Sequence, residues 1–446
     1  MENQNIYEKP VTLKNILQFA VPTMAMTVFM SFYTMVDGLF VSNLIGTEAL
    51  SAINLTAPVI QLVTAVSAML ATGGSAVIMK KMGEHKTQEA QEDFTALILV
   101  NVAVGIVMWG LGRGIMNPVF RGMNLSEQVT GYCVEYLGPY LWFTVPILLM
   151  NNFTLYMIAS GKAALSLVCS VAGGVLNMIL DYVLIHICSM GISGAAVATG
   201  LGYSVTAIAG IFVFAKPTSL LRFKRPVFRW RVLAGGAANG CSEMATALVT
   251  GIITMMFNWT MLRYVGEEGI AAVTIIMYVL MFASSLYTGY SYGVAPMISF
   301  YYGEQNREKL KKMTVVSKKV IVAISLVTAA ASFAFTKPLV AVFARPDHPV
   351  YGLAVTGNRI CTAALLFIGF NIYTSNMFTA LSNGIVSAVL AFSRSFVFMV
   401  ITMIILPAVL GVNGIWLATP AAELMAFVLS ASMFFRYKGK YGYWGK

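Results

Sequence analysis

The sequence predicts an all-α, polytopic membrane protein with twelve transmembrane helices in two pseudo-symmetric six-helix bundles around a central cavity. Of the 446 residues, 58% are hydrophobic and only 11% are charged, which leaves too little polar surface for a soluble chain of this length. Apolar runs of about 20 residues, each long enough to span a bilayer, recur along the whole chain. A repeat with one constant offset relates the two halves of the sequence.

The expected spans are the apolar runs that lie between polar or basic loops. In the first half they cover residues 12–41, 52–79, 94–116, 132–158, 163–188 and 191–215. In the second half they cover residues 232–262, 270–300, 315–336, 353–380, 385–409 and 412–435. The stretch KPTSLLRFKRPVFRWR separates the two sets. We therefore divide the chain into an N-lobe (1–215, spans one to six), a basic cytoplasmic linker (216–231) and a C-lobe (232–446, spans seven to twelve).

The distribution of basic residues predicts the orientation in the membrane. With the N-terminus in the cytoplasm, 22 of the 29 lysines and arginines fall on the cytoplasmic side, six fall on the opposite side, and Arg394 lies within a span. This excess follows the positive-inside rule. We therefore expect a multi-pass protein of the cytoplasmic (inner) membrane with both termini in the cytoplasm. The net charge of +11 then reflects orientation and contact with membrane lipid, and we expect no nucleic-acid partner.

Four pairs of matching segments, all separated by 220 residues, form the internal repeat. They are IGTEALSAINL (45–55) with VGEEGIAAVTI (265–275), Gly73 with Gly293, GE (83–84) with GE (303–304), and GISGAAVAT (191–199) with GVNGIWLAT (411–419). Because each repeat holds an even number of spans, both halves start on the same side of the membrane. They must be parallel repeats with a cavity between two bundles, which is typical of secondary transporters. A pseudo-symmetric channel is the alternative.

Two signatures of other classes are absent from the sequence. It contains no GxxxxGK[ST] or HExxH motif, so nothing predicts an ATP-driven motor or a zinc-dependent metalloprotease, and we expect no enzyme activity. The five cysteines are scattered and show no disulfide or metal-binding spacing. We expect no resident cofactor.

The polar residues inside the spans are the candidate functional residues, because an aspartate near the middle of a membrane helix costs roughly 2.5–3.5 kcal/mol. Asn177 and Asp181 are four residues apart and share one face of the fifth span. Thr199, on the neighbouring sixth span, could bring its hydroxyl near Asp181. Such oxygens suit a proton or a small cation such as Na⁺. A structural polar cluster that bonds helices together is the alternative.

The first span carries a second acid, Asp37. At helical spacing its face also holds Tyr33 and Met30, which could line a substrate cavity. Pro22 lies further back and should kink or hinge this helix, because it removes a backbone hydrogen bond.

The C-lobe does not duplicate the acid pair. At the 220-residue offset Asp181 becomes Ile401 and Asp37 becomes Phe257, so we expect ion coupling in the N-lobe. Polar residues of other spans could either line the cavity or bond helices together, and these two interpretations stay open. They are Asn151, Glu243, Asn258, Asn371 and Arg394.

Several motifs, taken in order, show a resemblance to a known family. They are AVPTM (20–24), MVDGLFVS (35–42), GTEALSAINLTAP (46–58), GGSAVIMKKMGE (73–84), NMILDYVLIH (177–186) and MGISGAAVAT (190–199). With these motifs the chain resembles bacterial multidrug and toxic compound extrusion (MATE) transporters, which belong to the multidrug/oligosaccharidyl-lipid/polysaccharide (MOP) exporter superfamily. The likeness covers nearly the whole chain.

The resemblance implies multidrug efflux, and with it antibiotic resistance, through exchange of lipophilic organic cations for H⁺ or Na⁺ by alternating access. It implies a coupling site at Asp37, Asn177, Asp181 and Thr199, which would be the metal ligands if Na⁺ is the coupling ion. It also implies a bending first helix at Pro22. Glu243 resembles a glutamate of span seven in some members, but the aspartate that accompanies it on span ten is replaced here by Asn371.

The expected partners are small lipophilic cations and membrane lipid, and the expected state is a monomer. A lipid-linked oligosaccharide flippase of the same superfamily is the alternative function. That flippase should have a more cationic cavity, whereas Arg394 is the only basic residue deep in a span.

Overall fold

The computed structural model describes the backbone of residues 6–44, 47–122 and 127–445; side chains are not described for residues 6, 37–44, 47–51, 54, 117, 121 and 122. Helices are the only regular elements within these ranges. The first half contains η1 (Ile6–Glu8), α1 (Leu13–Leu44), α2 (Thr47–Gly83), α3 (Thr87–Gly122), α4 (Glu127–Trp142), α5 (Thr144–Ala159), α6 (Ala163–Asp181), η2 (Tyr182–Ile187) and α7 (Gly191–Ala215).

The second half continues with twelve further helical elements within the described residues. They are α8 (Trp230–Asn239), α9 (Cys241–Tyr264), α10 (Glu267–Gly303), α11 (Arg307–Ala334), α12 (Thr336–Ala341), α13 (Pro349–Cys361), η3 (Thr362–Ala364), α14 (Leu365–Ala380), α15 (Gly384–Phe392), η4 (Ser393–Val397), α16 (Phe398–Leu410) and α17 (Val412–Tyr441), where η3 and η4 are single turns that join longer helices.

The described residues contain eleven helical segments long and apolar enough to cross a membrane, and a twelfth when α4 and α5 count as one span. These two helices meet at an angle of 53°. Pro146 lies in the first turn of α5 and has no N–H to donate to the carbonyl of Trp142, so the helix breaks just before it. The fourth predicted span is therefore a bent pair, and the seventh is likewise divided, into α8 and α9.

The backbone repeats itself between the halves. His85 and Gln305 occupy the turns that follow α2 and α10, and both adopt the left-handed conformation, with φ of 61° and 57°. Gly191 begins α7 and Gly411 directly precedes α17, with φ of 58° and 59°. Both pairs have the 220-residue offset of the sequence repeat. The predicted fold class of two repeated helical halves is confirmed.

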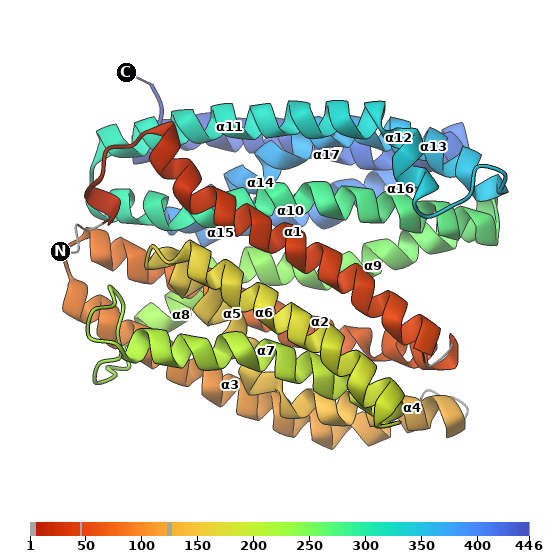
Figure 1. Cartoon of the computed structure of the whole chain (residues 1–446). Helices are drawn as coiled ribbons and strands as arrows, with labels where there is room; N and C mark the ends of the chain where they lie inside the picture. The colour runs from red at the N-terminus through yellow and green to blue at the C-terminus, as the bar shows by residue number, and fades with distance from the viewer. Residues whose placement is uncertain (1–5, 45–46, 123–126, 446) are drawn as a thin grey trace.

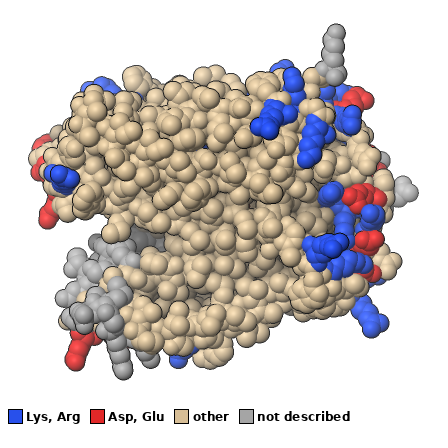
Figure 2. Space-filling model, turned by 180° about the vertical axis from the view of Figure 1, so that it is seen from behind, with Lys and Arg blue, Asp and Glu red and all other residues tan. Residues whose placement is uncertain are grey.

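Both termini and residues 216–231 lie at one end of the molecule, which we call the linker end (Figure 1). Helices α2–α7 gather in one half, α10–α17 gather in the other, and α1 crosses between them. Figure 2 shows the lysine and arginine side chains concentrated at the linker end, and the surface hollowed between the halves at the opposite end. The basic side chains, the two termini and the linker therefore all lie at the same end of the molecule.

The two halves make close backbone contact near the linker end. A Cβ added to Gly83 of α2 would lie 2.0 Å from the carbonyl oxygen of Phe300, and one added to Gly303 of α10 would lie 2.0 Å from that of Lys80. These two contacts are related by the repeat offset. They form a seam that only glycine permits, since any side chain there would separate the helices.

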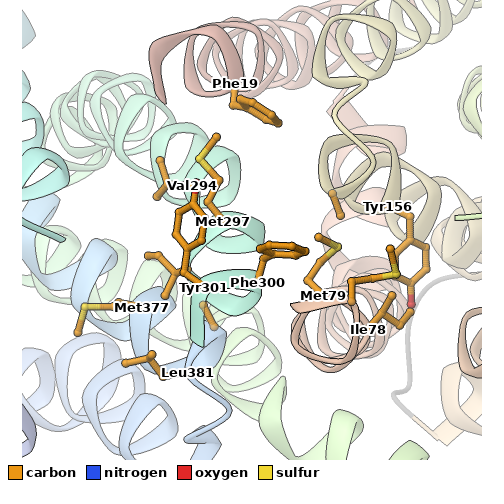
Figure 3. Packing of buried hydrophobic residues seen from close by; sticks show 14 of the residues in the cluster. Phe19, Ile78, Met79, Tyr156, Val294, Met297, Phe300, Tyr301, Met377 and Leu381 are labelled. Atoms are coloured by element: carbon orange, nitrogen blue, oxygen red, sulfur yellow. The ribbon is translucent and has the colours of Figure 1, made fainter. Parts of the chain in front are cut away.

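Buried apolar side chains from both halves pack beside this seam. Phe19 of α1 and Met79 of α2 share one hydrophobic cluster with Met297 and Phe300 of α10 and Met377 of α14 (Figure 3). Because apolar burial and close packing both favour this contact, the halves are held shut at the linker end.

Tyr7, in the short turn η1, braces the same region. Its side chain is fully buried, its hydroxyl donates a hydrogen bond to the carbonyl of Ala159 in the first half, and its ring stacks on Phe300 of the second half at a centroid distance of 4.8 Å. Burial raises the pKa of Tyr7 far above its usual value, so the hydroxyl stays neutral and remains a donor. The N-terminal segment thus connects both halves.

The basic linker is fastened to the first half. Arg229 donates to Glu92 at 2.6 Å and to Asp93 at 2.7 Å, and these acids, Glu92 first, raise the pKa of its guanidinium. Asp93 is fully buried and also pairs with Lys81 of α2. The backbone N–H of Lys224 donates to Thr95. The linker therefore follows the start of α3, and the connection to the second half begins after Arg229.

We expect Asp93→Asn to loosen this attachment. The change removes the charge that holds Arg229 and Lys81, and charge-assisted hydrogen bonds of this kind contribute about 2 kcal/mol. The melting temperature in detergent should fall, and trypsin should cleave faster at Lys224. The exposed pair of Glu308 and Lys312 provides the control, because Glu308→Gln should change neither measurement. Equal effects of the two substitutions would contradict the prediction.

Candidate functional site

Two of the four predicted coupling residues, Asn177 and Thr199, meet where α6 packs on α7, and Asp181 lies on the same helix as Asn177. Asn177 is 1% exposed, Asp181 is fully buried and Thr199 is 7% exposed. The amide Nδ2 of Asn177 donates to the hydroxyl Oγ1 of Thr199 at 3.3 Å. Asp181 is the last residue of α6, one helical turn beyond Asn177. The sixth span thus brings its hydroxyl to the polar face of the fifth.

Glycines explain why these side chains can meet. A Cβ added to Gly202 of α7 would lie 2.8 Å from the carbonyl oxygen of Gly173 and 2.9 Å from the Cβ of Asn177. The two backbones are therefore in direct contact at this level of the bundle. A π-helical turn, Tyr182–Ile187, follows Asp181 directly, and such turns are frequent at functional sites.

The fourth coupling residue, Asp37, belongs to α1, but its side chain lies outside the described residues. Helix α1 packs along α6, since a Cβ on Gly174 would lie 2.7 Å from the ring of Phe29 and 3.6 Å from that of Tyr33. Met30 and Tyr33 border a pocket of only about 10 Å³ against α6 and α7. That volume holds about one water molecule, so this part of the first half is almost closed.

Helix α1 is continuous through Pro22, the predicted hinge. On the facing helix α10, a Cβ on Gly289 would lie 2.6 Å from the Cα of Met24, and one on Gly293 would lie 2.8 Å from the Cα of Ala20. The hinge position therefore lies where α1 is pressed against the second half. Bending α1 there would require this contact to change.

A cavity of about 340 Å³ lies between the two halves. Met30, Asn151 and Tyr203 border it from the first half, and Glu243 and Tyr292 border it from the second. The hydroxyl of Tyr292 donates to Oε2 of Glu243 at 3.1 Å. The structure thus brings Met30, Asn151 and Glu243 of the predicted cavity set together.

A second cavity, of about 490 Å³, penetrates the second half. Glu243 borders it together with Asn371, Arg394 and Glu423. The guanidinium Nε of Arg394 donates to both carboxylate oxygens of Glu423, at 2.8 and 3.0 Å, and the amide of Asn371 donates to one of them at 2.7 Å. Asn258 is not among the described residues that border either cavity.

Sequence reasoning missed three features of this region. No local sequence pattern identifies Tyr292 as the hydrogen-bond donor to Glu243, because the two residues are 49 positions apart. The π-helical turn Ser393–Val397, which carries Arg394, has no sequence signature. The pairing of Arg394 with Glu423 was open to inference, since each is the single charged residue deep in its span, and buried charges are usually paired.

The MatE family model matches residues 22–183 and 244–405, one copy in each half. The multidrug export protein MepA of Staphylococcus saprophyticus is 21% identical over 422 residues, which cover 93% of this chain and 91% of that protein. MepA of Staphylococcus haemolyticus is also 21% identical, over 95% of this chain and 93% of that one.

Solved structures show the same fold. A MATE protein in complex with MaL6 superposes with a TM-score of 0.93 at 22% identity, over 98% of this chain and 99% of that chain. An outward-facing multidrug resistance MATE transporter of the MOP superfamily superposes with a TM-score of 0.89 at 23% identity, over 95% and 96%. The two repeated helical halves and these superpositions agree with the duplicated family match, which shows that the chain belongs to the MatE family.

Proposed function

We propose that the protein is a secondary active antiporter that exports lipophilic organic cations in exchange for H⁺ or Na⁺ by alternating access. The observation that carries the proposal is the fully buried Asp181 on a membrane helix, beside the hydrogen-bonded pair of Asn177 and Thr199. A buried acid of this kind is costly and is usually retained for ion transport. The relatives named as multidrug export proteins support drug export as the function.

Drug and ion would act through one electrostatic balance. With Asp37 and Asp181 ionised, the first half would attract a cation. Entry of H⁺ or Na⁺ would neutralise the acids, favour bending of α1 at Pro22 and expel the drug. By linkage, ion and drug must then lower each other's affinity by the same factor.

The charge of the cavities favours a cationic substrate over the flippase alternative. Glu243 and Glu423 face one arginine, Arg394, in the second half, so the described charged groups there carry one excess negative charge. A lipid-linked pyrophosphate would require an excess of basic groups. An excess of negative charge in the cavity favours the binding of a cation, as the antiporter proposal requires.

We place the N-lobe at 1–215, the linker at 216–231 and the C-lobe at 232–446, with the linker end in the cytoplasm and the protein acting as a monomer in the cytoplasmic membrane. The Lys/Arg concentration at the linker end supports this orientation (Figure 2). With the seam shut there, the conformation corresponds to an outward-open transporter. One solved structure that is named as outward-facing shares the fold.

The test is efflux of a fluorescent lipophilic cation from proteoliposomes under an imposed pH gradient or Na⁺ gradient, applied one at a time. We expect one of the gradients to drive efflux and an ionophore that collapses it to stop transport. If neither gradient drives efflux of a broad panel of cations by the folded protein, the antiporter proposal is wrong. Transport of lipid-linked oligosaccharide under the same conditions would then favour the flippase.

A further inference from the structure

Arg394 borders the second-half cavity as its only basic residue among the described ones. It sits on the π-helical turn Ser393–Val397 within a span, and its side chain is 20% exposed. A charged arginine at this depth is costly unless it is paired or used. The pairing with Glu423 accounts for only part of its hydrogen-bonding capacity.

A guanidinium has five N–H donors, and Arg394 spends only the Nε–H on Glu423, at 2.8 and 3.0 Å. No described residue accepts a hydrogen bond from Nη1 or Nη2. Glu423, which is 4% exposed, receives a further hydrogen bond from Asn371 at 2.7 Å. The acid is thus satisfied within the protein. The two-nitrogen edge of the guanidinium, which binds a carboxylate in a bidentate manner, has no hydrogen-bond partner among the described residues.

The same cavity offers a complementary group for a cation. Glu243 borders both this cavity and the one between the halves. Among the described side chains only Tyr292 donates a hydrogen bond to its carboxylate, at Oε2. The wall of this cavity also includes Ile253, Met277 and Met281. Flexible thioethers adapt to flat apolar ligands, and about 490 Å³ is within the usual range for a small-molecule site.

We infer that this cavity binds zwitterionic aromatic amphiphiles, with the ligand's carboxylate on the Nη1/Nη2 edge of Arg394 and its cationic group toward Glu243. The inference rests on the proposed export function and specifies one of its substrate classes. It assigns Arg394 to substrate discrimination: a carboxylate would be accepted here, and its ester would lose that contact.

The test uses rhodamine B, which carries a free carboxylate and a cationic ring system, and its ethyl ester, which has the same ring system without the acid. Binding to the purified full-length protein is measured by fluorescence anisotropy. The main variant is the double substitution Arg394→Gln with Glu423→Gln, which removes both charges and leaves neither partner buried alone. Arg394→Lys keeps the charge and loses the planar fork, and Arg359→Gln removes an exposed arginine outside the cavity.

We expect the double variant to weaken rhodamine B binding by about 10- to 100-fold, as for loss of a charge-assisted hydrogen-bonded pair, and to leave ester binding within about twofold. Arg394→Lys should show an intermediate loss for the acid alone, and Arg359→Gln should show none. The unchanged ester affinity reports that the variant is folded.

Equal weakening of both dyes, or no change for the acid, overturns the assignment of Arg394, while ester binding leaves the export proposal standing. If the wild-type protein binds the ester but not the acid, the assignment of Arg394 is likewise wrong and the export proposal stands. If the wild-type protein binds neither dye, the carboxylate site is wrong, whereas the export proposal is decided separately by gradient-driven efflux of the cation panel.

Discussion

Replacing Asp181 by asparagine is expected to abolish gradient-driven efflux while leaving the protein folded. The side chain is fully buried, and asparagine keeps nearly the same shape and can still form hydrogen bonds, but it cannot release or bind a proton. The linkage between ion and drug should therefore disappear. A coupling free energy of the usual size changes drug affinity by about 5- to 150-fold, and this ion dependence should vanish in the variant.

The measurement is the initial efflux rate in proteoliposomes together with drug affinity at two proton or Na⁺ concentrations. Asp347→Asn, the same substitution in an exposed loop, is the matched control and should transport normally. Glu243→Gln tests the second half directly. If Asp181→Asn transports at the wild-type rate and Glu243→Gln does not, coupling lies in the second half and the N-lobe assignment is wrong.

The double substitution Gly83→Ala with Gly303→Ala is expected to force the seam at the linker end open. Each new Cβ would lie 2.0 Å from a backbone carbonyl oxygen of the facing helix, and backbone cannot rotate away as a side chain can. Overpacking costs about 1–3 kcal/mol at a single site. Two such sites should shift the equilibrium between shut and open seams by at least about 30-fold.

Spin labels at His85 and Gln305 would report this change, because both lie on turns of the linker end, in opposite halves. Double electron–electron resonance should give one short label-to-label distance in the wild type. In the variant a second population with a longer distance should appear, and efflux should be slower. Gly110→Ala is the control, since nothing lies within 4 Å of its added Cβ. An unchanged distance distribution in the double variant would show that the seam is not closed by these contacts.

The sequence alone predicted the class of protein, the number and approximate places of the spans, and the repeat. These features depend on local properties of the sequence. The spans follow from the length of each apolar run relative to the thickness of the bilayer, and the repeat follows from short motifs that recur at one offset. The helical period also placed Asn177 and Asp181 on one face. The breaks before Pro146 and at Gly240 changed the shape of two spans and left the topology intact.

The tertiary structure was needed for contacts between residues distant in the sequence. Helical spacing says which residues share a face, but the rotation and tilt of each helix against its neighbours decide what that face meets. Glu243 stands between two cavities because α9 packs against both halves. Arg394 directs one nitrogen to Glu423, and its two other nitrogens have no hydrogen-bond partner in the part of the chain that the structure describes. The attachment of the linker to α3 and the bracing by Tyr7 likewise join segments more than 100 residues apart, and no local pattern encodes them.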